Sequence, residues 1–156
     1  MPEQKTLVIK FGGTSVGSVD ALKNATQIIR DAKKDWERVV VVTSAMSGVT
    51  NLLLDSAASA SHGKVDSLAQ AAATLREKHF TAIEALIPNS VKRNQVIAEI
   101  DDLIFSLVDL CKAIAVLGEA SPRAMDTVAS LGERMSVRLL AAVVDSAGIS
   151  AQAIES

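Results

Sequence analysis

The sequence is poor in the residues that carry several common chemistries. It has one cysteine, two histidines, no tyrosine and only 3% aromatic residues. The single Cys111 excludes an intramolecular disulfide, and two histidines without partners at ligand spacing argue against a zinc site. With a net charge of −2, the chain also lacks the basic surface and aromatic platforms used for nucleic acids. We therefore expect no nucleic acid partner and no metal ligands in this chain.

A long apolar segment is also missing. Residues 1–5 contain no apolar signal core, and the longest apolar run, residues 139–144, is far shorter than the ~20 residues that a membrane span needs. These features and the low cysteine content predict a soluble, cytoplasmic protein with no membrane partner. Apolar residues as a class are plentiful, at 49% of the 156 residues. The chain can therefore bury the core of one domain.

The amino-terminal third has the pattern of a βαβ unit. A β-branched run that begins at Thr6, followed by two glycines, predicts a buried strand and a tight loop. Ser18 is placed to cap a helix that extends through Lys33. Residues 38–43 are apolar without alternation, which predicts a parallel strand covered on both faces. The connection between the two strands should be right-handed.

The rest of the chain is mostly helical. Apolar residues recur at helical spacing, and breaks at Gly63, Pro88 and Gly148 separate the segments. A further strand is predicted at the carboxyl end. The expected helices cover residues 50–61, 65–86, 91–117 and 122–146, and the strand covers residues 149–154. Because no helix follows this strand, one edge and one face of the sheet should be uncovered, which indicates a fragment that self-associates.

The first candidate site is the sequence KFGGTS at residues 10–15, between the first strand and its helix. Two glycines let a ligand approach the backbone closely, and their N–H groups can bind an anion near the following helix N-terminus. Lys10 adds a full positive charge. Such a loop suits the phosphates of a nucleotide, although it matches neither the P-loop nor the dinucleotide fingerprint. An ordinary βα turn with glycines for steric reasons is the alternative.

The second candidate is the hydroxyl-rich segment TSAMSGVTN at residues 43–51. It also follows a strand, and ligands of open parallel sheets bind at the carboxyl ends of strands, so both loops should lie at one rim. Ser44, Ser47, Thr50 and Asn51 could bind a small polar substrate there. Each could equally serve as a helix cap or a turn residue.

The third candidate is LGERMS at residues 131–136, in the middle of the last predicted helix. A glycine there costs about 1 kcal/mol relative to alanine, which indicates close packing against another element. Glu133 falls in a largely apolar column, so it is either partly buried beside a cation or at the edge of the apolar stripe. A ligand ammonium is one such cation. The alternative is a solvated or ion-paired glutamate.

Together, KFGGTSV at 10–16, SAMSGVTNLL at 44–53 and GERMS at 132–136 resemble successive signatures of aspartokinases, in the same order. The resemblance implies the N-terminal portion of an α/β fold, a carbamate-kinase-like three-layer αβα sandwich with a mainly parallel sheet. It also implies the phosphorylation of the aspartate side chain by ATP with Mg²⁺, as the first step of the lysine, threonine and methionine pathway.

The same resemblance implies a role for each matching residue. Lys10 would be catalytic, stabilising the transferred phosphoryl group, and the ATP-binding stretch would comprise Lys10, Phe11, Gly12 and Gly13. Thr50 and Glu133 match aspartate-binding positions, with Glu133 holding the α-ammonium, and Ser44 matches a residue that lines the same pocket.

The kinase domain of that family continues well beyond residue 156. It goes on to the arginine that holds the substrate carboxylate, a catalytic aspartate and most of the nucleotide pocket, with regulatory domains later still. We therefore expect residues 1–156 to be the substrate-binding part of a kinase domain, inactive alone, from a protein that forms a homo-oligomer. A stand-alone module for binding a small ligand or for oligomerisation, without kinase chemistry, is the alternative.

Overall fold

The computed structural model describes residues 5–155. It opens with strand β1 (Thr6–Phe11), a short 3-10 turn η1 (Gly13–Ser15), helix α1 (Val19–Asp35) and strand β2 (Arg38–Thr43). The strands are parallel, with Thr6 opposite Arg38 and Phe11 opposite Thr43. Ser18 caps α1 through a hydrogen bond from the Ala21 N–H at 3.2 Å. The predicted βαβ unit is therefore confirmed.

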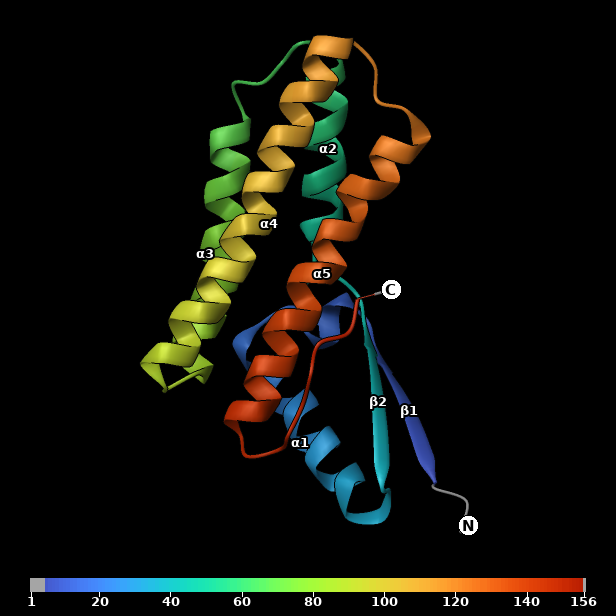
Figure 1. The fold of residues 1–156 in the computed structure, drawn as a ribbon, viewed down its shortest axis with the longest axis vertical. Helices are drawn as coiled ribbons and strands as arrows, with labels where there is room; N and C mark the ends of the chain where they lie inside the picture. The colour runs from blue at the N-terminus through green and yellow to red at the C-terminus, as the bar shows by residue number, and fades with distance from the viewer. Residues whose placement is uncertain (1–4, 156) are drawn as a thin grey trace.

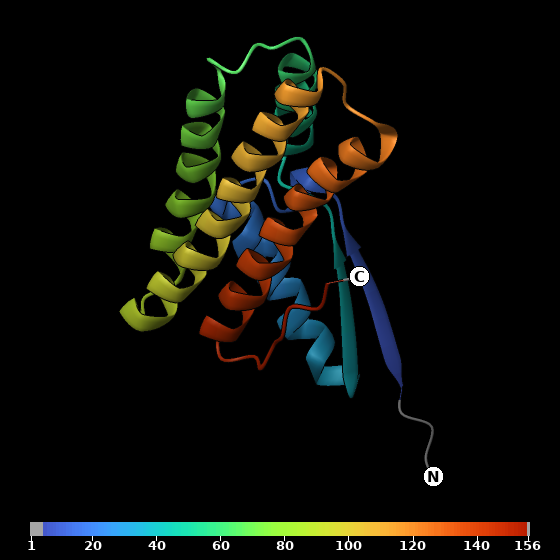
Figure 2. The ribbon, with the colours of Figure 1, turned by 45° about the horizontal axis from the view of Figure 1, so that its top comes forward.

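Four long helices follow and stand side by side (Figures 1 and 2). They are α2 (Val49–Ser61), α3 (Leu68–Leu86), α4 (Ser90–Leu117) and α5 (Pro122–Ser146). All four were predicted, although α3 begins later than expected because residues 65–67 form a turn closed by the Leu68 N–H and the Val65 carbonyl. Among residues 5–155, no helix is long and apolar enough to cross a membrane.

The core lies between these helices and extends to one face of the sheet. The apolar stripe predicted for α4 is buried along its whole length, including Cys111, whose thiol has its pKa raised by burial. Helix α5 packs on α4 and α2 and also contacts α1 and β2. Figure 1 shows it descending from the helical bundle past the carboxyl ends of the strands.

Only one face of the sheet is covered within residues 5–155. The odd-numbered strand residues face α1 and α5, whereas Val8, Val40 and Val42 on the opposite face are 63%, 42% and 48% exposed. The uncovered face predicted for a partial domain is therefore confirmed. The expectation that both faces of the second strand are covered fails here, because this part of the chain supplies a helical layer to one side alone.

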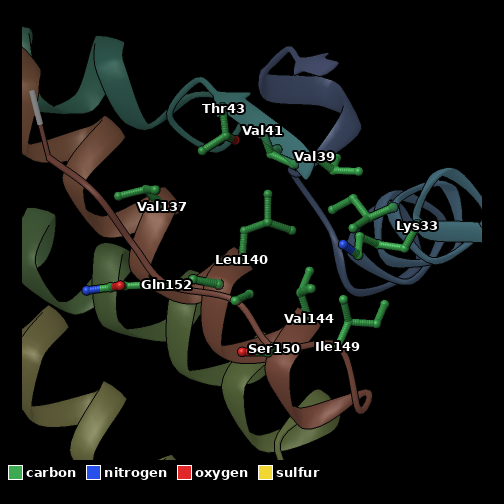
Figure 3. Close-up of a pocket in the computed structure, with 13 residues that line it drawn as sticks. Lys33, Val39, Val41, Thr43, Val137, Leu140, Val144, Ile149, Ser150 and Gln152 are labelled. Carbon is green, nitrogen blue, oxygen red and sulfur yellow. The ribbon is translucent and has the colours of Figure 1, made fainter. Parts of the chain in front are cut away.

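The predicted strand at residues 149–154 is wrong. These residues are extended but form no ladder with β2. A hollow of about 200 Å³ separates them from Val39 and Val41, and Figure 3 shows Ile149 and Ser150 on the side opposite these valines. Glu155 instead forms ion pairs with Arg134 and Arg138 of α5. A strand needs a hydrogen-bonded neighbour, and the segment is tied to the helix instead.

His79 is the one fully buried histidine of the described chain. Its burial predicts that the free energy of unfolding decreases in acid. Its Nδ1–H donates to the Leu75 carbonyl at 2.8 Å, while Nε2 has no partner. Burial lowers the pKa of the ring, with a smaller contribution from Lys78, against the raising effect of the Leu75 bond. The unfolded chain takes up this proton near pH 6.5, so the contribution of His79 to stability should be constant above that pH and fall below it.

His79→Leu should flatten this dependence, because one proton linked to unfolding contributes up to about 1.4 kcal/mol per pH unit. Urea unfolding at pH 7 and pH 5.5 measures the difference. His62→Leu, at an exposed position, is the matched control and should leave the dependence unchanged. Equal slopes for both variants and the parent would mean that His79 does not resist protonation.

Candidate functional site at the carboxyl ends of the strands

The glycine loop follows β1 directly. Phe11, the last strand residue, is buried and anchors the loop, while Gly12 opens the 3-10 turn and its carbonyl accepts from the Ser15 N–H at 3.0 Å. Lys10 lies opposite Val42 in the ladder and is exposed on the uncovered face of the sheet. An added Cβ at Gly12 would meet no atom within 4 Å. The loop therefore presents open backbone next to an exposed ammonium group.

The hydroxyl-rich loop lies against the glycine loop. The Ser44 N–H donates to the Phe11 carbonyl at 3.1 Å, and the Ser47 N–H donates to the Gly13 carbonyl at 3.2 Å. These bonds continue the pairing of β1 and β2 beyond the ends of the strands. The two loops thus share one rim, as the parallel topology predicts.

The hydroxyl groups of this loop are not used as helix caps. Helix α2 begins after Gly48, which has a φ of 80° and provides no side-chain cap. Within the described residues, the side chains of Ser44, Ser47 and Thr50 make no hydrogen bond to protein groups. Ser44 and Thr50 are half-buried. The capping interpretation is therefore wrong for these residues, and their hydroxyls are available to a ligand.

Two glycines let three elements meet at the rim without intervening side chains. A Cβ at Gly13 would lie 2.8 Å from the Ala45 carbonyl oxygen, and one at Gly132 would lie 2.8 Å from the Ala45 Cβ. Such distances exclude a side chain unless the backbone moves. Gly132 also abuts Val49 and Leu53 of α2. The close packing inferred for Gly132 from the sequence is confirmed, and it holds α5 against the hydroxyl-rich loop.

Glu133 follows Gly132 and is exposed. Among residues 5–155 its carboxylate forms no ion pair. Partial burial beside a cation is therefore not observed, and the exposed side chain fits both the edge of the apolar stripe and the solvated alternative. Arg134 and Arg138 point to a different, polar face and pair with Glu155, and burial together with the neighbouring Arg134 lowers the pKa of Arg138.

Sequence reasoning missed a pair of hydroxyls beneath the rim. The Thr43 Oγ1 and Ser136 Oγ atoms are 3.4 Å apart, and Ser136 is only 1% exposed. Both residues occur inside the candidate motifs, but their pairing spans 93 positions. No local signal in either segment indicates that they face one another.

Two hollows are each lined by one residue of the segment 43–51: Thr43 borders the first and Met46 borders the second. The hollow of Figure 3 is mostly apolar, and Lys33 reaches toward it from α1. A more open hollow of about 450 Å³ lies between the start of α1 and α3, near Ser18 and Lys78. Neither is lined by Lys10 or Glu133. The candidate site is thus an open rim on this part of the chain.

Known proteins resemble this chain over almost all of its length. The model of the amino acid kinase family matches residues 5–156. The bifunctional aspartokinase/homoserine dehydrogenase 1, chloroplastic, of Arabidopsis thaliana is 36% identical over 143 residues, which are 91% of this chain and 15% of that protein. The aspartokinase of Schizosaccharomyces pombe is 32% identical over 163 residues, 99% of this chain and 30% of that protein.

A solved structure gives the same result for the fold. The structure of E. coli aspartokinase III in complex with aspartate and ADP matches with a TM-score of 0.77 and 31% identity, over 95% of this chain and 30% of that one. The predicted fold class, the N-terminal portion of an α/β sandwich with a parallel sheet, is therefore confirmed. The chain spans only about 15% to 30% of the length of these relatives.

Proposed function

This chain belongs to the amino acid kinase family, and on that premise we propose that it is the N-terminal, substrate-binding part of an aspartate kinase. The enzyme would transfer the γ-phosphoryl group of ATP to the side-chain carboxylate of aspartate. One observation carries the proposal: the lysine–glycine loop and the hydroxyl-rich loop are joined by two backbone hydrogen bonds at the carboxyl ends of parallel strands. The aspartate and ADP bound to the E. coli relative support the same substrates here.

The lysine–glycine loop would bind and stabilise the phosphoryl group. Lys10 is the catalytic residue in this proposal, because its exposed ammonium can neutralise charge on the group in transfer. Gly12 and Gly13 would offer backbone N–H groups, with Phe11 fixing the loop from the core. The open space above Gly12 supports this role, because a ligand can reach the backbone there.

The other side of the rim would hold the amino acid. Glu133 would accept hydrogen bonds from the α-ammonium of aspartate. Ser44 and Thr50 would donate hydrogen bonds from their hydroxyl groups to the carboxylate oxygens of aspartate. The absence of protein partners for these side chains, within the part of the chain described, supports a ligand role. A carboxylate oxygen of aspartate would attack the γ-phosphorus, the bond to the bridging oxygen would break, and ADP would leave.

Mg²⁺ would neutralise phosphate charge during this transfer. No group of three or more acidic, histidine or cysteine residues that could hold a metal ion occurs within residues 5–155. We therefore propose that the ion enters with the phosphates of ATP and is held by residues beyond this portion. A cytoplasmic homo-oligomer that starts the lysine, threonine and methionine pathway is part of the same proposal.

The test is an assay of the full-length protein with ATP and aspartate, in which hydroxylamine traps the acyl phosphate as a hydroxamate. We expect hydroxamate formation that depends on aspartate and is absent with glutamate. Binding of aspartate without any hydroxamate would favour the ligand-binding module instead. If hydroxamate formed only with a different acidic amino acid, the proposed kinase activity would stand and aspartate would be the wrong substrate.

A further inference from the structure

Two hydroxyls link α5 to the loop that follows β2. The Thr43 Oγ1–H donates to the Ser44 carbonyl at 3.2 Å. The Thr43 Oγ1 lies 3.4 Å from the Ser136 Oγ, which is longer than the about 2.5 to 3.0 Å usual for an O–H···O bond. Thr43 is half-buried and Ser136 is almost fully buried. Buried hydroxyls of this kind need partners within the protein.

The geometry alone allows either hydroxyl to donate across this link, and proton counting decides between them. A threonine hydroxyl has one proton, which Thr43 gives to the Ser44 carbonyl, so it can only accept from Ser136. The order is therefore Ser136 to Thr43 to the Ser44 carbonyl. Each hydroxyl in such a chain polarises the next one. We call these three groups the hydroxyl relay.

The hydroxyl relay completes the fixation of Ser44. The N–H of this residue donates to the Phe11 carbonyl, and its carbonyl accepts from Thr43, so both backbone groups are held. Ser136 lies one helical turn after Gly132, on the helix face that packs against the same loop. The hydroxyl relay thus couples the helix carrying Glu133 to the loop carrying Ser44.

We propose that Thr43 and Ser136 are positioning residues, which hold Ser44 and the hydroxyl-rich loop in register with Glu133 for binding of the amino acid substrate. This inference rests on the proposed function for its substrate, but the geometry it describes belongs to the chain itself. It places the relay under the amino acid side of the rim. The nucleotide side, formed by Lys10 and the glycines, has no bond to either hydroxyl.

The full-length protein with Ser136→Ala, Thr43→Val or Thr43→Ser tests the proposal. The first two variants break the relay and should raise KM for aspartate about five- to tenfold, with KM for ATP changed less than about twofold. Thr43→Ser keeps the hydroxyl and should remain near the parent. The double variant Ser136→Ala/Thr43→Val should match Thr43→Val, because the relay is already broken. Ser130→Ala is the matched control, since its exposed hydroxyl bonds only to the Thr127 carbonyl.

Amide hydrogen exchange provides a readout that needs no substrate. Exchange at residues 44–48 should be faster in Ser136→Ala and Thr43→Val than in the parent, and unchanged in Thr43→Ser and Ser130→Ala. If the parent does not phosphorylate aspartate, the proposed function is wrong. The amide hydrogen exchange rates still test whether the hydroxyl relay holds the loop. Parent-like exchange in the broken variants would overturn it, as would equal increases in both KM values. Ser136→Ala removes one buried oxygen, so it carries the test if Thr43→Val does not fold.

Discussion

Lys10→Ala in the full-length protein is expected to lower kcat by at least about 100-fold, while the affinity for aspartate changes much less. Lys10 is exposed on the uncovered face of β1, two residues before the open backbone of Gly12. Its charge is needed mainly while the phosphoryl group is in transfer, when negative charge is spread over several oxygens. An interaction made chiefly in the transition state lowers kcat when removed.

Steady-state kinetics with both substrates measures this effect. Lys112→Ala, which removes an equally exposed lysine from α4, is the control and should behave as the parent. A near-normal kcat for Lys10→Ala would remove Lys10 from the proposed chemistry. A melting temperature equal to that of the parent would confirm that the loss is not one of folding, since the side chain is solvent-exposed.

Glu133→Gln is expected to raise KM for aspartate about tenfold or more. The substitution keeps the shape of the side chain and removes its charge, and a charge-assisted hydrogen bond contributes about 1.5 to 3 kcal/mol. The fold should be unaffected, because Glu133 is exposed and has no ion-pair partner within residues 5–155. Glu119→Gln, in the exposed connection before α5, provides the matched control.

Two measurements together decide this prediction. KM for aspartate and the melting temperature should separate, with the first raised and the second unchanged. An unchanged KM with a sharply lower melting temperature would identify Glu133 as part of a structural ion pair formed with another portion of the protein. The substrate ammonium would then need a different partner.

The helices could be predicted because their signals are local. Ser18 and Ser121 cap α1 and α5 through bonds to backbone N–H groups three residues ahead, and apolar residues at helical spacing define the buried stripes between such caps. The strand expected at residues 149–154 had a comparable local signal. Whether such a segment forms a strand depends on a partner strand from elsewhere in the chain. In the described residues, the Glu155 ion pairs hold the segment on α5 instead.

Some features of the candidate site could likewise be predicted from the sequence, and others could not. The shared rim followed from topology, because parallel strands joined by a helix bring their carboxyl ends together. The packing of Gly132 was predictable from its cost within a helix. The bond between Thr43 and Ser136 was not, because nothing local in either segment indicates a partner 93 residues away. The exposure of Glu133 likewise depends on the rotation of α5, which the close approach of Gly132 to Ala45 sets.

The ion pairs of Glu155 also decide where the polypeptide leaves this part of the fold. The segment after α5 turns back along the helix, and Figures 1 and 2 show it reaching the carboxyl end of β2, whereas β1 starts at the opposite end of the strands. A fluorescent label on a cysteine introduced at position 154, where the isoleucine side chain is 80% exposed, would therefore lie near the rim and should respond to ligand binding. A label at position 6, at the exposed start of β1, would be separated from the rim by the length of the strand and should stay silent.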